Sequence, residues 1–128
     1  MAEPLDPQVV LFAPVKGVRV EDDGTITPFG IFTRVTPLWP GTPVELDFTV
    51  FALLIGGIGD FTIGVQLIDP DGAIRFEESA ALAFTDRHRL FGLDWRVRAE
   101  TGYGEHELRL VIDDRAAVIS LPFLVDDA

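Results

Sequence analysis

The two histidines of the chain are the side chains best suited to acid–base catalysis or metal binding near neutral pH. His88 lies in the segment DRHR at residues 86–89, and His106 lies between Glu105 and Glu107. A catalytic zinc site usually needs three protein ligands, and no HxH or HExxH spacing brings two ligands together. We interpret His88 as a solvated loop residue and His106 as a hydrogen-bonded structural residue facing the interior. A metal-assisted hydrolase around either histidine is the third of three functional hypotheses.

Three acidic segments offer carboxylates, the oxygen ligands that calcium prefers. They are DDG at residues 22–24, DPDG at residues 69–72 and DD at residues 113–114. An EF-hand loop has a third acidic residue before its glycine, and the DPDG segment lacks it. Asp and Gly also favour tight turns for backbone reasons, so we predict turns at all three segments. No metal and no other cofactor is predicted.

Residues that could act as nucleophiles are few. The chain has no cysteine, which excludes thiolate nucleophiles, thiolate metal sites and disulfides. Its only serines, Ser79 and Ser120, do not lie in a GxSxG motif. The glycine-rich segment GGIG at residues 56–59 lacks the lysine of a phosphate-binding loop. We therefore predict that the protein is not an enzyme and has no catalytic residues.

Four segments alternate apolar and polar residues, and they occupy residues 44–54, 61–67, 91–98 and 105–112. Successive side chains of a strand point to opposite faces, so each segment is expected to have one buried and one wetted face. Short turns between such segments favour antiparallel pairing. We predict seven to nine strands, at residues 9–13, 15–20, 25–35, 44–55, 61–68, 74–84, 91–98, 105–112 and 117–125.

A single sheet of that many strands would leave its apolar face in water, so the strands are expected to form two packed sheets. The fold class predicted is all-β, an antiparallel two-sheet β-sandwich. The segment TGY at residues 101–103, followed by two long strands, is typical of the last hairpin of an immunoglobulin-like sandwich. We expect one domain over residues 9–125, with Trp95 in its core, after a flexible N-terminal segment at residues 1–8.

Several segments also carry a resemblance to a known group of proteins. They are VLFA at residues 10–13, DGTITPFGIF at residues 23–32, DPDG at residues 69–72 and the closing hairpin. Over residues 9–125 the chain resembles a group of small, functionally uncharacterised bacterial β-sandwich proteins. The resemblance implies an immunoglobulin-like sandwich and a cytoplasmic location, and it implies no particular activity.

The charge of the chain limits its partners. Ten basic and 21 acidic residues give a net charge of −11, which repels nucleic-acid phosphates and anionic lipid. The longest apolar run, at residues 51–58, is far shorter than the ~20 residues of a spanning helix. The first eight residues are acidic and contain two prolines, unlike a signal peptide. We expect a cytoplasmic protein that binds neither nucleic acid nor membranes.

The strand predicted at residues 44–55 changes character along its outward side. Glu45, Asp47 and Thr49 are followed there by the apolar residues Phe51, Leu53 and Ile55. Either another part of the same chain covers these three side chains, or they form a surface for a second copy or a protein partner, since contiguous exposed apolar patches mark interfaces. The first functional hypothesis is therefore a non-enzymatic interaction or structural module that uses an outer sheet face, as a homo-oligomer or with a protein partner.

A second binding candidate is the loop PLWPG at residues 37–41, in which Trp39 stands between two prolines. Tryptophan is enriched at binding hot spots, so Trp39 is either a recognition tip or an aromatic folded over the end of the sandwich. The alternative hypothesis is thus a module that binds a small ligand, sugar or peptide through loop-end aromatics, Trp39 and Tyr103.

Overall fold

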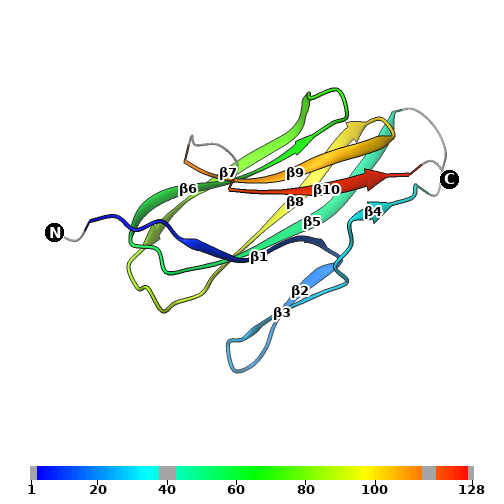
Figure 1. The fold of residues 1–128 in the computed structure, drawn as a ribbon. Helices are drawn as coiled ribbons and strands as arrows, with labels where there is room; N and C mark the ends of the chain where they lie inside the picture. The colour runs from blue at the N-terminus through cyan, green and yellow to red at the C-terminus, as the bar shows by residue number, and fades with distance from the viewer. Residues whose placement is uncertain (1–2, 38–42, 114–117, 127–128) are drawn as a thin grey trace.

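The structure of the protein is a computed structural model that describes residues 3–37, 43–113 and 118–126. The described residues form ten strands and no helix, so the prediction of an all-β fold is confirmed. The strands lie in three sheets, one more than predicted (Figure 1). Every pairing between named strands is antiparallel except a short parallel one between β4 and β10.

The first sheet has three strands in the order β1-β5-β8. They are β1 (Gln8–Val15), β5 (Val44–Ile55) and β8 (Phe91–Thr101). The second sheet has five strands in the order β4-β10-β9-β6-β7. They are β4 (Arg34–Val35), β6 (Gly59–Ile68), β7 (Ile74–Phe84), β9 (Gly104–Ile112) and β10 (Ile119–Val125). The third sheet is a hairpin of β2 (Gly17–Val20) and β3 (Ile26–Phe29).

One hydrophobic core is shared by the two larger sheets. It combines alternate residues of β5 and β8 with alternate residues of β6, β9 and β10. Phe48 of β5 stacks on Phe123 of β10, with ring centroids 4.9 Å apart, and Trp95 is buried as predicted. Burying a large apolar side chain contributes about 1.5–3 kcal/mol, so this shared core holds the two sheets against each other.

The predicted strand at residues 25–35 is broken in the structure. Strand β3 ends at Phe29, Gly30 has a φ of 69°, and β4 then pairs with β10 in the five-stranded sheet. A positive φ is readily adopted only by glycine, so the chain turns at Gly30 and passes from the hairpin to another sheet. The predicted strand therefore corresponds to two short strands in two different sheets.

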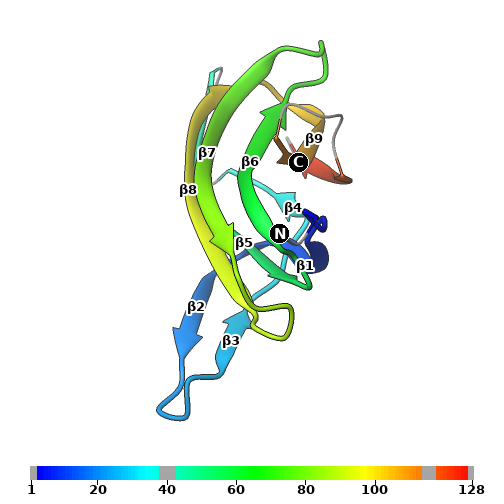
Figure 2. The ribbon, with the colours of Figure 1, turned by 90° about the vertical axis from the view of Figure 1, so that its left-hand side faces the viewer.

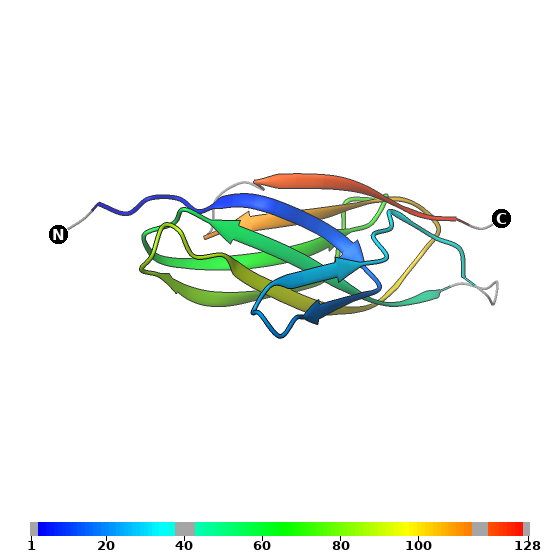
Figure 3. The same cartoon turned by 90° about the horizontal axis from the view of Figure 1, so that it is seen from below.

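The hairpin of β2 and β3 extends below the two larger sheets in Figure 1 and away from them in Figure 2. Figure 3 shows the molecule from below, which is the side on which the hairpin lies. The two strands are joined by a three-residue loop at residues 22–24. Gly24 in this loop has a φ of 85°, and the Glu21 N–H donates to the Thr25 carbonyl across it at 2.8 Å. The Asp23 carboxylate accepts hydrogen bonds from both the Thr25 N–H and its hydroxyl, as an Asx turn requires.

The segment before β1 makes ordered contacts. Leu5 and Ile58 exchange two backbone hydrogen bonds, at 2.8 and 3.0 Å, and Pro7 is buried. Residues 5–7 therefore lie against the turn between β5 and β6. No helix that could span a membrane occurs in the described part of the chain.

Candidate functional site

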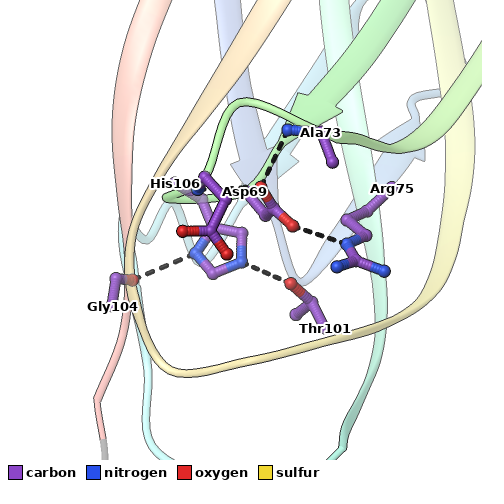
Figure 4. A network of polar contacts seen from close by, with 7 residues as sticks. Asp69, Ala73, Arg75, Thr101, Gly104 and His106 are labelled. Carbon is purple, nitrogen blue, oxygen red and sulfur yellow. Dashed lines mark hydrogen bonds and ion pairs between the residues drawn. The ribbon is translucent and has the colours of Figure 1, made fainter.

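His106 has a structural environment. It lies at an inward position of β9, its side chain is 2% exposed, and both ring nitrogens have partners (Figure 4). Nδ1 lies 3.0 Å from the Gly104 carbonyl, which can only accept, so Nδ1 carries the proton. Nε2 lies 2.7 Å from the Thr101 hydroxyl, which is the donor when the ring carries its proton on Nδ1 alone. The prediction of an inward-facing, hydrogen-bonded histidine is confirmed.

The DPDG segment is a turn organised by Asp69. One carboxylate oxygen accepts the N–H groups of Asp71 and Ala73, each at 2.9 Å, and the other accepts from Arg75 Nε at 2.7 Å. The hydrogen bond from the Ala73 N–H, with that from Arg75, holds the pKa of Asp69 below its usual value. Asp69 is therefore a charged, fully engaged turn residue, and the predicted turn is confirmed.

The remaining polar candidates do not converge. His88 is exposed, and its backbone N–H donates to the Asp86 carboxylate at 2.9 Å. Asp113 accepts from the Thr62 N–H at 2.9 Å and has a φ of 55° in a turn. Across residues 3–37, 43–113 and 118–126, no group of three His, Cys, Asp or Glu side chains is arranged to hold a metal ion.

The three apolar residues on the outward side of β5 have different environments. Phe51 is 2% exposed and forms a second small core with Ala13 and Val15 of β1. Leu53 and Ile55 are half-buried. Phe51 is therefore not part of an open partner surface: the same chain covers it.

The cover of Phe51 is the hairpin. Val18 of β2 and Ile26 of β3 pack against the Phe51 cluster. A Cβ placed on Gly92 of β8 would lie 3.1 Å from Ile26 and 3.4 Å from Phe51, so Gly92 leaves the space in which these two side chains meet. The apolar change along β5 was thus a signal for an intrachain contact, with its partner strands at residues 17–29.

Beyond this contact the hairpin carries exposed apolar residues. Val20 is 70% exposed and Phe29 is 50% exposed, and Ile31, just after the hairpin, is 57% exposed. The end of the Phe29 ring lies against Gly17, where an added Cβ would approach the ring Cζ atom to 2.5 Å. A two-stranded hairpin is only marginally stable alone, so the contact of Val18 and Ile26 with the Phe51 cluster holds it to the body, while Val20 and Phe29 are exposed in the monomer.

Prolines occupy the outward edges of three strands. In β1, the Pro14 main chain points to the edge away from β5, because its carbonyl accepts from the Phe32 N–H. In β10, the N–H groups of Leu124 and Asp126 donate toward the β4 side. By alternation, Pro122 of β10 stands where an N–H would also point to that side. Proline cannot donate there, so strands β1 and β10 are protected against the addition of another strand.

In β3, Pro28 holds the equivalent outward position, because the main-chain groups of Glu21 and Thr25 point toward each other inside the hairpin.

Strand β2 differs from these three strands. Because Glu21 N–H points toward β3, the main-chain groups of Val18 and Val20 point to the opposite edge of β2. Among the described strands only β3 pairs with β2, and β2 contains no proline. On its solvent face Arg19 Nε contacts the Glu21 carboxylate at 2.8 Å. The edge of β2 therefore offers free hydrogen-bonding groups flanked by one cation and one anion.

The loop-end aromatics give no assembled site. Trp39 lies outside the described residues. Tyr103 is half-buried and packs against the main core. Neither a family model nor a curated protein matches this chain.

Proposed function

We propose that the protein is a non-enzymatic interaction module that self-associates through the β2–β3 hairpin. The observation that carries the proposal is the free edge of β2, next to the most exposed apolar side chain of the hairpin, Val20. The proposal keeps the sequence-based hypothesis of an interaction module and moves the interface from Phe51, Leu53 and Ile55 to the hairpin that covers Phe51.

The proposed architecture of the body is an immunoglobulin-like sandwich of the two larger sheets, with the hairpin as an addition. The shared core of these sheets supports this assignment. The resemblance to uncharacterised bacterial β-sandwich proteins and a cytoplasmic location remain part of the proposal. They are supported by the closing β9–β10 hairpin and by the acidic, cysteine-free composition.

The proposed partner is a second copy of the chain, because the charges along β2 complement themselves. If two β2 strands pair antiparallel with Val20 opposite Val20, the N–H of each Val20 donates to the carbonyl of Val20 in the other copy. In this register Arg19 of one copy lies opposite Glu21 of the second copy, and the reverse pair forms on the other side. Opposite charges directly across a strand pair are favourable by about 0.2–1 kcal/mol each.

The pairing also brings the exposed Val20 side chains of the two copies next to each other. The two hairpins would form a four-stranded sheet with Val18, Val20 and Ile26 of both copies on one face. A net charge of −11 on each copy opposes association at long range. At about 0.15 M salt the Debye length is about 8 Å, so this long-range repulsion is screened more strongly than the adjacent Arg19–Glu21 contacts.

The test is a mixing experiment by sedimentation velocity at 0.15 M salt. Arg19→Glu places two glutamates opposite each other, and Glu21→Arg places two arginines opposite each other, so each variant alone should be monomeric. An equimolar mixture of the two variants should form dimers, because every cross-strand pair is then oppositely charged. An interaction confined to one chain would not be restored by mixing.

Two further variants complete the design. Val20→Pro removes an outward N–H without removing a β2–β3 hydrogen bond, and it should abolish the dimer. Arg87→Glu, on the exposed loop between β7 and β8, changes net charge as much as Arg19→Glu and should leave the dimer intact. A wild-type chain that sediments as a monomer at high micromolar concentration would overturn the proposal, as would a mixture that stays monomeric.

A further inference from the structure

A groove opens where β1 ends beside β5. Strand β1 pairs with β5 only as far as Val15 opposite Thr49, and β5 continues to Val44 without a strand on that side among those described. The groove has a volume of about 640 Å³ and lies between the end of β1, β4 and the middle of β5. Small-molecule sites typically have volumes of about 300–1,000 Å³, so the groove has room for a ligand of that class.

The floor of the groove is apolar and held in place. Phe48 of β5 is 8% exposed, and the half-buried Phe32 lies edge-on to it with ring centroids 5.9 Å apart. Phe123 stacks on Phe48 and also lies against Phe32, with ring centroids 6.1 Å apart, and Val35 of β4 also lines the groove. These rings are fixed by the main core, so an apolar ligand would meet a preformed surface.

The rim of the groove is cationic in a chain of net charge −11. Of the three cations among the described residues that line it, two are already neutralised. Arg96 contacts both carboxylate oxygens of Asp47, and Arg34 contacts Asp126 at 2.9 Å. The hydrogen bond from Arg96, with the charges of Arg96 and Arg98, holds the pKa of Asp47 below its ordinary value, so that pair stays ionised.

The third cation is Lys16, the only lysine of the chain. It forms no ion pair with the described residues. Its position is defined, because its stem lies against Gly30, where an added Cβ would approach Lys16 Cγ to 2.6 Å. The positive φ of Gly30 and its missing side chain therefore place the Lys16 stem beside the groove.

We propose that this groove binds a small amphipathic carboxylate, an aromatic or acyl group that carries one negative charge. Its apolar part rests on Phe32 and Phe48, and its carboxylate meets the Lys16 ammonium. A single unneutralised cation matches a single negative charge, and a cationic ligand would leave Lys16 unpaired and repelled. The proposal does not depend on self-association, because the free edge of β2 and the groove use different residues.

The test is a ¹H–¹⁵N NMR titration of the full chain with 4-phenylbutyrate as the probe. We expect saturable shifts centred on the amides of Lys16, Phe32 and Phe48. Butyrate lacks the ring, and 4-phenylbutylamine has the opposite charge, so both should bind at least tenfold more weakly. Lys16→Gln should weaken 4-phenylbutyrate about 3- to 10-fold and leave 4-phenylbutylamine no weaker, because only the anion loses a partner.

Matched variants separate this site from general surface binding. Arg87→Gln removes an exposed cation remote from the groove and should leave 4-phenylbutyrate affinity unchanged. Phe32→Leu keeps an apolar, foldable side chain but removes a ring, and it should weaken the probe at least threefold. Equal binding of the acid and the amine, shifts centred elsewhere, or no effect of Lys16→Gln would each overturn the proposal.

Discussion

The Nε2 atom of His106 lies 2.7 Å from the Thr101 hydroxyl, inside the protein and between the last residue of β8 and the inward face of β9. The two residues are five positions apart, joined by the tight connection at residues 102–103. This hydrogen bond ties the corner at which the chain crosses from the three-stranded to the five-stranded sheet. A buried acceptor without its donor is costly, so the corner depends on both partners.

Replacing Thr101 with valine tests this hydrogen bond. Thr101→Val keeps the shape but leaves Nε2 of His106 buried without a donor, which should lower the free energy of unfolding by about 1–3 kcal/mol. Urea denaturation measures the change. Thr62→Val, at an exposed position of β6, is the matched control and should have little effect. Equal stability of Thr101→Val and wild type would show that the hydrogen bond contributes nothing.

The lowered pKa of Asp69 predicts a pH-dependent contribution to stability. Its carboxylate is stabilised in the folded state first by the Ala73 N–H and then by Arg75. A group with a lowered folded pKa stabilises above its unfolded pKa, near 3.8, and loses that effect as pH falls through the folded value. The stability difference between wild type and Asp69→Asn should thus be largest near neutral pH and shrink below about pH 4. Unfolding curves in which this difference stays constant from pH 7 to pH 3 would contradict the assignment.

Phe51 should anchor the hairpin to the body. Phe51→Ala removes a buried ring and should cost about 3–5 kcal/mol of unfolding free energy. It should also release the hairpin, which amide hydrogen exchange at Glu21 would report as faster exchange. Leu53→Ala, at a half-buried position of the same strand, should cost less and leave this exchange slow. Unchanged exchange at Glu21 in Phe51→Ala would show that the hairpin is held by other contacts.

Gly24 gives a test of the hairpin turn. It has a φ of 85°, and an added Cβ would meet nothing within 4 Å, so Gly24→Ala introduces backbone strain without a clash. The expected loss is about 1–2 kcal/mol in thermal or urea unfolding. Gly102 is equally open but has no positive φ. Gly102→Ala should therefore be neutral or slightly stabilising, and a similar loss at both glycines would contradict the argument.

Pro122 should prevent the edge of β10 from pairing with a strand of another copy. Pro122→Val restores an outward N–H on an exposed strand edge, which favours pairing between copies at that edge. Light scattering during incubation at 37 °C should show faster aggregation than wild type. Pro70→Val, in the exposed turn after β6, also replaces a proline but opens no strand edge. Aggregation that rises equally in both variants would point to a general loss of stability.

Much of the fold was predictable because the direction of a strand side chain is a local property. Leu46, Phe48, Leu108 and Leu110 were expected inside from their alternation alone, and all four are buried. The turns at residues 22–24 and 69–72 followed from Asp and Gly, whose backbone preferences act over a few residues. His106 was expected at an inward position for the same reason.

The tertiary structure decided which surfaces remain free. Phe51 has the same residue type and spacing whether a partner or the same chain covers it, and only the path through β2 and β3 places Val18 and Ile26 over it. The break at Gly30 divides the single strand predicted at residues 25–35 between two different sheets. The exposed edge of β2 is a further consequence of that path.

The sequence by itself therefore determined the strands, the inward residues and the turns, because these depend on alternation and on backbone preferences of neighbouring residues. Only the tertiary structure decided that Lys16, Arg34 and Phe48, from distant parts of the chain, line one groove, and that Thr101 donates to His106. The physical reason is that such meetings depend on strand order and sheet packing. Many strand orders satisfy one alternating pattern, and long-range contacts select among them.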